Sequence, residues 1–259
     1  MRLEVKEVRK TFSGKGQEVE ALAGVDLAVA EGEFVSIVGP SGCGKSTLLE
    51  IVGGLIGPTG GEVLIEGEPI NGPHPAVGLV FQQESAFPWR TVLGNVEFGL
   101  EMHGVAKGER RERSRALIEL VGLKGFEDRY PGELSGGMRQ RVAIARTLVM
   151  NPEVLLMDEP FGALDEQTRL ILGDELLSIW SETKATALFI THSIEEATLL
   201  SDRVIVMSAR PGTIKKVVTV DLERPRDSSV VGTPEFGNIT GDVWKVLREE
   251  SMKTLKGHV

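Results

Sequence analysis

The chain has 259 residues, 41% hydrophobic and 26% charged, a composition typical of a globular protein with a substantial buried core. Its formal net charge of -9 argues against a general nucleic-acid binder, which carries a basic face, so we expect no nucleic-acid partner. The single cysteine, Cys43, excludes an intramolecular disulfide and fits a reducing cytosol.

The N-terminal part of the chain has the pattern of β-strands. Strand-like alternation covers residues 2–9 and 18–30, with a polar turn at 13–16 between them. A first apolar helix runs from Lys45 to about Leu55. Further strands are predicted at 34–38, 63–65, 77–81, 154–157, 187–190 and 204–207, and helices separate the last three. Strands that alternate with helices form a mainly parallel sheet covered on both faces, so the fold class is α/β, with an N-terminal antiparallel β-subdomain.

The middle of the chain reads as a helical insertion into this core. From Thr91 to Met150 the patterning is helical, and the charge-rich stretch 107–115 is typical of a solvated helix face. We expect a single domain, 1–259, with core segments 1–82 and 151–220, a helical subdomain 83–150 and a C-terminal tail 221–259. No apolar stretch approaches the roughly 20 residues that span a bilayer, so any path across a membrane would be formed by another polypeptide.

A glycine-rich motif lies between the strand at 34–38 and the helix that begins at Lys45. It fits G-x-x-x-x-G-K-[ST] with Gly39, Pro40, Ser41, Gly42, Cys43, Gly44, Lys45 and Ser46, followed by Thr47. Glycines let the backbone wrap around phosphate oxygens, and the helix presents its positive end to the same anion. Lys45 would bind the β- and γ-phosphates and Ser46 would bind Mg²⁺. The alternative is a chance glycine-rich turn, but the strand–turn–helix context favours a nucleotide site in a P-loop NTPase core.

Two further motifs extend this prediction. The apolar run at 154–157 ends in Asp158, which can face Mg²⁺ across from the P-loop, and Glu159, which can polarise an attacking water. The alternative is a solvated acidic turn. Ser135 precedes Gly136, Gly137 and an apolar helix, a capped helix start whose free N–H groups form a second anion site. The alternative there is an ordinary capped helix.

Cys43 lies inside the glycine-rich motif, near a helix N-terminus and next but one to Lys45. Both features stabilise a negative charge on sulfur. We therefore expect the Cys43 side chain to ionise readily and to face the phosphates.

Together these motifs resemble the ATP-binding subunits of ABC transporters over most of the chain. By that resemblance, Gln82 looks like the Q-loop glutamine, which takes part in catalysis and in Mg²⁺ binding, and His192 looks like the switch histidine that contacts the γ-phosphate. Phe12 sits where an aromatic ring stacks on adenine. Asp165, in Ala163-Leu164-Asp165, looks like the D-loop aspartate. The resemblance implies ATP hydrolysis, with ATP and Mg²⁺ as cofactors.

The resemblance also implies partners. In the family two subunits face each other head to tail, so a second copy of this chain would hold ATP between its signature, at 134–138, and the P-loop of the first. Transmembrane permease subunits would dock a helix in the groove at 82–95, which includes Phe87 and Trp89, although core packing is the alternative for these two rings. A solute-binding protein would act indirectly. The subunit would lie peripherally on the cytoplasmic face of the cell membrane.

Two positions depart from the family pattern. Met138 stands where glutamine is usual in the signature, and Phe12 replaces the more frequent tyrosine but keeps the aromatic face. The stretches 157–165, 191–197 and 208–212 resemble the importer ATPases for nitrate, sulfonate and taurine. Two alternatives stay open: an ABC-type ATPase of DNA repair or chromosome maintenance, which would carry a coiled-coil or zinc insertion, and a non-transport ABC regulatory protein, which would lack Glu159 or His192.

Overall fold

The computed structural model describes residues 1–14, 17–82, 85–162 and 164–255. Parts of four predicted segments lie outside the described residues: 15–16 of the turn, 83–84 of the groove, Ala163 of the D-loop and 256–259 of the C-terminal tail. Within the described chain, no helix combines the length and the apolar character needed to cross a membrane.

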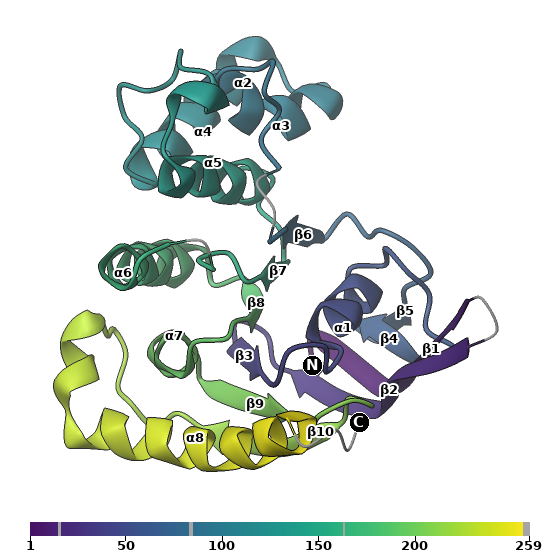
Figure 1. The fold of residues 1–259 in the computed structure, drawn as a ribbon. Coiled ribbons are helices and arrows are strands. Elements are labelled where there is room, and N and C mark those ends of the chain that lie inside the picture. Colours follow the sequence, from purple (N-terminus) through teal and green to yellow (C-terminus); the bar gives the residue numbers. More distant parts are fainter. Residues whose placement is uncertain (15–16, 83–84, 163, 256–259) are drawn as a thin grey trace.

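The N-terminal strands form a small antiparallel sheet, as predicted (Figure 1). In spatial order, its described strands are β2 (Gln17–Val29), β1 (Leu3–Gly14), β4 (Gly60–Ile65) and β5 (Glu68–Pro69). Strands β1 and β2 pair antiparallel along most of their length, and β4 pairs antiparallel with the other side of β1.

The central sheet is mainly parallel, which confirms the predicted fold class. In spatial order, its described strands are β10 (Ile214–Thr219), β9 (Arg203–Met207), β3 (Phe34–Val38), β8 (Thr186–Ile190), β7 (Val154–Asp158) and β6 (Val77–Val80). All neighbours pair in parallel except β10, which runs antiparallel to β9 at the edge. The carboxyl ends of β3, β7 and β8 therefore meet at one edge, where ligands bind in sheets of this kind.

The sheet strands alternate between two cores because successive side chains point to opposite faces. On β7, Leu155 and Met157 pack with Leu172 and other residues of α6, whereas Leu156 packs with Leu48 of α1 and with the small sheet. Figure 1 shows this arrangement: α6, α7 and α8 cover one face, and α1 and the antiparallel sheet cover the other. The described helices are α1 (Lys45–Val52), α2 (Val92–Val96), α3 (Phe98–Met102), α4 (Lys107–Leu120), α5 (Gly136–Leu148), α6 (Glu166–Thr183), α7 (Ile194–Leu200) and α8 (Pro234–Leu255), with 3-10 turns at Pro131–Glu133 and Ser228–Gly232.

Helices α2–α5 lie between β6 and β7 in the chain and stand at the top of Figure 1. In α4, only Ser114 and Ile118 are buried, and most of the charge-rich stretch is solvated, as predicted. Arg110 differs, because its side chain is 17% exposed and pairs with Glu97. The buried side chains of α2, α4 and α5 nevertheless join those of α6 and the central sheet in one continuous cluster. The division of the chain at residues 83 and 150 therefore stays a prediction.

Two element boundaries differ from the sequence-based expectation. The first helix ends at Val52 rather than near Leu55, because Gly53 closes its last turn and Gly54 adopts a left-handed backbone. Strand β10 was not predicted at all. Of its six residues only Val218 is buried, and two lysines interrupt the apolar pattern.

Candidate functional site

The glycine-rich motif joins β3 to α1, which is the strand–turn–helix context that a P-loop requires. Gly44, the residue before the helix, has φ of 101°. A Cβ at this position would lie 2.7 Å from Leu22 Cδ2 and 2.9 Å from the Ala21 carbonyl oxygen, so only glycine fits. The buried Lys45 Nζ donates to the carbonyl oxygens of Gly39, at 2.9 Å, and of Pro40, at 3.2 Å. The loop therefore fixes the ammonium group over its own turn.

A cavity of about 310 Å³ opens in front of this loop. Nine of the residues predicted from sequence line it: Phe12, Ser41, Gly42, Gly44, Lys45, Ser46, Thr47, Glu159 and His192. Val19, Ala21 and Arg210 also line it, and the sequence did not single them out for this role. The cavity thus collects residues from β1, β2, the P-loop, the end of β7 and the segment after β8. Such convergence of polar groups in one hollow is typical of a ligand site.

The prediction that the Cys43 side chain ionises readily and faces the phosphates is wrong. Cys43 is 1% exposed, packs in the hydrophobic cluster of α1 and is not among the residues that line the cavity, although its Sγ lies 4.0 Å from Lys45 Nζ. Burial raises the pKa of the Cys43 thiol, and the positive charge of Lys45 opposes that rise only in part. Burial therefore outweighs the lowering effect of Lys45 and favours the neutral thiol over the thiolate.

Ser46, at the start of α1, contacts Asp158, at the end of β7. Ser46 Oγ donates to Asp158 Oδ1 at 3.3 Å. Burial raises the pKa of the Asp158 carboxyl, and the Ser46 hydroxyl and the charges of Lys45 and His192 do not fully compensate. A half-buried carboxylate beside a hydroxyl that lines the P-loop cavity suits Mg²⁺, because this ion takes oxygen ligands from protein and from phosphate. Among the described residues, no cluster of three or more acidic, histidine or cysteine side chains could hold a metal without such help.

The three predicted catalytic residues meet at one carboxylate. Gln82 Nε2 donates to Glu159 Oε2 at 3.0 Å, and His192 Nε2 lies 2.6 Å from Glu159 Oε1. The Glu159 backbone has φ of 45°, a left-handed conformation that a non-glycine residue adopts only at a cost. Its N–H donates to the Ile190 carbonyl oxygen at 2.9 Å, which ties this conformation to the end of β8.

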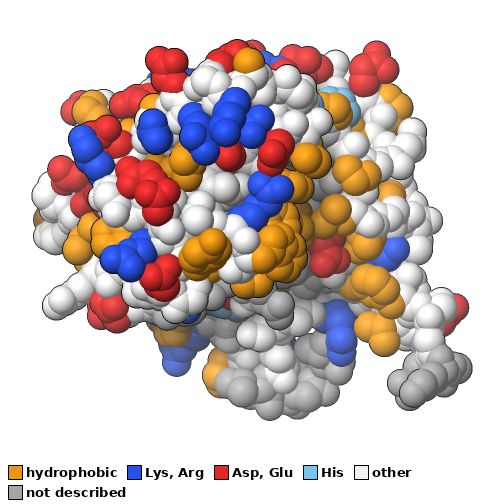
Figure 2. Space-filling model, turned by 90° about the horizontal axis from the view of Figure 1, so that it is seen from above, with side chains coloured by type: hydrophobic (Ala, Val, Ile, Leu, Met, Phe, Trp, Pro, Cys, Tyr) orange, Lys and Arg blue, Asp and Glu red, His pale blue; other side chains and the backbone are white. Residues whose placement is uncertain are grey.

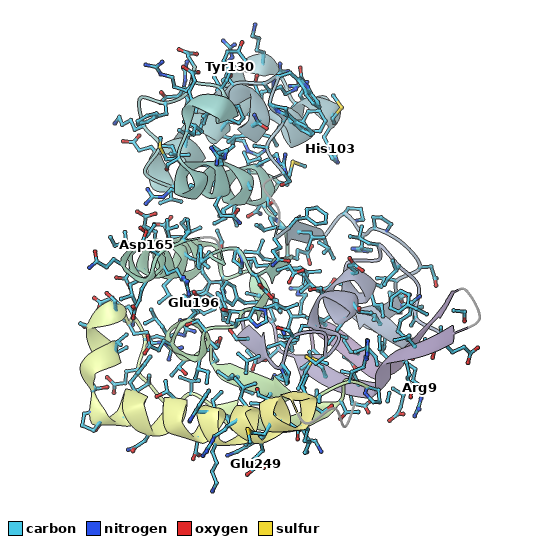
Figure 3. The ribbon with its side chains drawn as sticks, viewed as in Figure 1. Arg9, His103, Tyr130, Asp165, Glu196 and Glu249 are labelled. Atoms are coloured by element: carbon cyan, nitrogen blue, oxygen red, sulfur yellow. The ribbon has the colours of Figure 1, made fainter. Side chains whose placement is uncertain are left out.

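His192 is held by the start of α7. Thr191 Oγ1 donates to Glu196 Oε2 at 2.5 Å and accepts from the Ser193 N–H at 3.0 Å. Glu196, labelled in Figure 3, belongs to α7, and its side chain is 11% exposed, so burial raises the pKa of its carboxyl. These contacts hold the backbone beside His192, whose side chain is 49% exposed and pairs with Glu159.

The signature helix begins as predicted, but away from the P-loop. Ser135 is the N-cap of α5, and its Oγ accepts from the Met138 N–H at 3.3 Å. Ser135 and Gly137 do not line the P-loop cavity, whereas Gly136 lines a second cavity of about 260 Å³ with Gln82 and Glu159. Asp165 is the N-cap of α6, bonded to the Thr168 N–H at 3.0 Å, and it lines neither cavity (Figure 3).

An exposed aromatic turn follows β6. Trp89 is 72% exposed and stacks on Phe87 with ring centroids 5.5 Å apart, while Phe87 is half-buried against Phe98. Core packing is therefore the wrong interpretation for Trp89. The face seen from above in Figure 2 carries hydrophobic side chains among mixed charges.

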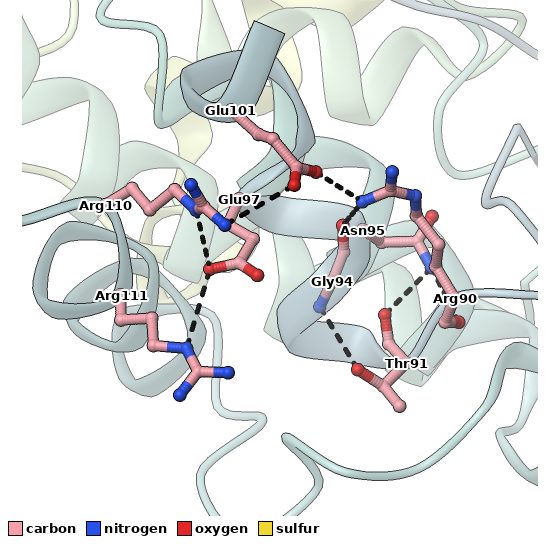
Figure 4. Close-up of polar contacts among 8 residues, drawn as sticks. All are labelled: Arg90, Thr91, Gly94, Asn95, Glu97, Glu101, Arg110 and Arg111. Carbon is pink, nitrogen blue, oxygen red and sulfur yellow. Dashed lines mark hydrogen bonds and ion pairs between the residues drawn. The ribbon is translucent and has the colours of Figure 1, made fainter. Parts of the chain in front are cut away.

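Buried Asn95 fixes the shape of this turn. Its Nδ2 donates to the carbonyl oxygens of Phe87 and Arg90, at 3.1 and 3.0 Å, and its Oδ1 accepts from the Phe87 N–H at 2.7 Å. Arg90 pairs with Glu101 at 2.8 Å, and Arg110 contacts the same carboxylate at 3.4 Å (Figure 4). Arg90 is thus occupied within the protein, and Trp89 is the side chain that the turn leaves free.

Comparison with known proteins gives consistent similarities. A family model described as ABC transporter matches residues 22–162. An uncharacterized ABC transporter ATP-binding protein of Methanocaldococcus jannaschii, MJ0412, is 53% identical over 256 residues, covering 99% of this chain and 95% of the relative. The nitrate import ATP-binding protein NrtD of Synechocystis is 45% identical, with 96% of each chain covered. The aliphatic sulfonates import ATP-binding protein SsuB of Bacillus thuringiensis is 46% identical, covering 88% of this chain and 90% of the relative.

Among solved structures, a dimeric post-hydrolysis state of the ATP-binding cassette MJ0796, bound to ADP and phosphate, is similar with a TM-score of 0.75. Its sequence is 36% identical, and the match covers 85% of this chain and all of that one. The similarity therefore extends to the fold around the P-loop.

Proposed function

The chain belongs to the ABC transporter family of ATP-binding, ATP-hydrolysing subunits, and from that premise we propose that it powers the import of a small nitrate-, sulfonate- or taurine-like solute. Relatives named for nitrate and for sulfonates are about equally similar to it, at 45% and 46% identity. These similarities support a small solute but do not select one of the three. In the proposed complex the permease, and not this chain, would contact the solute.

In the proposed mechanism, the P-loop cavity binds ATP, with Lys45 on the β- and γ-phosphates and Phe12 against the base. Ser46, Asp158 and Gln82 would hold Mg²⁺, which neutralises charge on the phosphates when bound. Glu159 orients and polarises the attacking water, and His192 contacts the γ-phosphate. The observation that carries this proposal is the meeting of Gln82, Glu159 and His192 beside the P-loop.

A second copy of the chain would complete the site. Ser135 and Gly137 lie off the P-loop cavity of their own chain, so their free helix N-terminus is available to the ATP of an opposing chain. The similar cassette MJ0796 is described as dimeric, which supports the same arrangement here. Asp165, at the start of α6, would then lie at the interface between the copies.

Permease subunits form the remaining proposed partners. The exposed Trp89 turn, held by Asn95, suits a helix of a membrane protein, because exposed aromatic side chains on a fixed backbone often anchor interfaces. The turn follows Gln82 in the chain, so docking and the catalytic cluster are physically connected. The subunit would lie on the cytoplasmic face of the cell membrane, and a solute-binding protein would deliver the cargo to the permease.

Replacing Lys45 tests the nucleotide site. Lys45→Ala removes the fixed cation of the P-loop, so we expect ATP turnover to fall by at least about a hundredfold. Turnover is measured by phosphate release, with Lys245→Ala on the exposed face of α8 as the matched control. Turnover near that of the control would overturn the P-loop assignment.

A further inference from the structure

Arg210 lines the proposed nucleotide site although no sequence motif predicts a ligand contact there. It follows β9 and lines the P-loop cavity together with Phe12, Val19 and Ala21. Lys45 and Arg210 are the lysine and arginine side chains in that lining. Lys45 is occupied by two loop carbonyl oxygens, whereas the Arg210 side chain has no hydrogen-bond or ion-pair partner among the described residues. Arg210 is exposed, so its five guanidinium donors stay available to a ligand in the cavity that it lines.

The turn that carries Arg210 is fixed from inside. Ser208 Oγ donates to the Pro211 carbonyl oxygen at 3.0 Å and accepts from the Thr213 N–H at 2.9 Å. The Ala209 N–H donates to Glu250 of α8 at 3.0 Å. Glu250 is only 4% exposed, so this contact is a buried carboxylate bond, which is among the stronger kinds. The backbone on both sides of Arg210 is thus held by polar contacts.

The same turn is pressed against the P-loop. The Gly212 N–H donates to the Ala21 carbonyl oxygen at 2.8 Å, and the Ala23 N–H donates to the Gly212 carbonyl oxygen at 3.1 Å. A Cβ on Gly212 would lie 2.1 Å from the Cys43 carbonyl oxygen, so the turn touches the phosphate cradle itself. A side chain on such a fixed base loses less entropy when it binds a ligand.

We propose that Arg210 is a further nucleotide-binding residue, whose guanidinium binds the α-phosphate, the phosphate nearest the ribose. The cavity has Glu159 and His192 among its lining, where the γ-phosphate would react, and Phe12 at the proposed base end. The turn that carries Arg210 is bonded through Gly212 to β2, and Val19 of β2 pairs with Phe12 of β1. Arg210 therefore lies on the side of the cavity where the base would bind, next to the phosphate that is nearest the sugar. The inference rests on the proposed nucleotide site and adds to it a charge from outside the P-loop.

Nucleotide titrations of the full chain with Mg²⁺ test this assignment. Arg210→Ala should raise the Kd for ATP and for ADP by a similar factor, about five- to tenfold, since both carry the α-phosphate. Arg210→Lys keeps the charge and should recover most of the affinity. The loss in the alanine variant should shrink as salt is added, because screening weakens the wild-type contact. Arg248→Ala, an equal charge change on the exposed face of α8, is the matched control.

Four results would overturn the inference: an unchanged Kd in Arg210→Ala, a loss confined to ATP, a loss that salt does not reduce, or no recovery in Arg210→Lys. Lys45→Ala is titrated in parallel to separate this inference from the proposed function. If Lys45→Ala abolishes binding and Arg210→Ala does not weaken it, only the role of Arg210 fails. If the wild type binds no nucleotide, the proposed site fails as well.

Discussion

Glu159 combines a costly backbone with a fixed carboxylate. A left-handed conformation at a non-glycine residue costs on the order of 1–3 kcal/mol and persists where surrounding contacts enforce it. Here the N–H bond to Ile190 ties Glu159 to β8, and the side chain reaches Gln82 and His192. In this conformation Glu159 lines both the P-loop cavity and the second cavity, so one carboxylate serves both.

We expect the stability difference between Asp158→Asn and the wild type to depend on pH. Burial raises the pKa of this carboxyl, so its ionised form destabilises the nucleotide-free fold, in full above the folded pKa and less as the pH falls through it. Asp158→Asn removes that charge. We expect the variant to be more stable than wild type by on the order of 1 kcal/mol at neutral pH without Mg²⁺, with the gap closing on acidification. Urea unfolding at several pH values measures it, and a gap that widens in acid would contradict the account.

The residues of the site were predictable to different degrees. Lys45, Ser46 and Asp158 follow from motif spacing, because their roles depend on the local strand–turn–helix geometry. The burial of the Cys43 side chain could not be predicted from the motif, because packing between α1 and the sheets decides it. Arg210 could not be found either, because its place in the cavity depends on contacts with β2 and α8, which are distant in the chain.

At the scale of elements, the signature helix and the aromatic turn are directly connected. Arg146 of α5 donates to the Ser85 carbonyl oxygen at 2.6 Å and lies over the Phe87 ring, 5.1 Å from its centroid. Burial lowers the pKa of Arg146, which indicates that the contact is shielded from water. A shift of α5 relative to the sheet would therefore move the turn that carries Trp89.

The exposed turn predicts a loss of partner binding that leaves the nucleotide site intact. Trp89→Glu places a charge where a permease helix is proposed to dock, so co-purification of membrane partners from solubilised native membranes should fall at least about tenfold. ATP affinity should stay unchanged. Trp244→Glu, on the exposed face of α8, is the matched control, since Trp244 is 56% exposed. Equal partner recovery with both variants would contradict docking at this turn.

Element prediction succeeded where burial was complete. The strands at 34–38, 154–157 and 187–190 are apolar on both faces, and the structure has them within a residue or two. Strand β10 lies at the sheet edge with one buried side chain, so its apolar signal is weak and tertiary pairing with β9 decides it.

In the proposed head-to-tail dimer, each chain would carry half of two ATP sites. The P-loop cavity lies at the carboxyl edge of the central sheet, and the N-terminus of α5 presents Ser135 elsewhere. Two chains facing head to tail would supply both halves to each ATP. ATP binding would then favour closure, and hydrolysis would release it.

Gel filtration of Glu159→Gln with ATP or ADP tests whether two chains close around ATP. The glutamine keeps the size of the side chain and removes its charge, so ATP should bind while turnover falls by roughly 10²–10⁴. We expect a shift from monomer to dimer with ATP but not with ADP, and loss of that shift when Ser135→Arg obstructs the opposing site. An elution volume that ignores ATP would contradict the sandwich, and turnover equal to wild type would remove Glu159 from the chemistry.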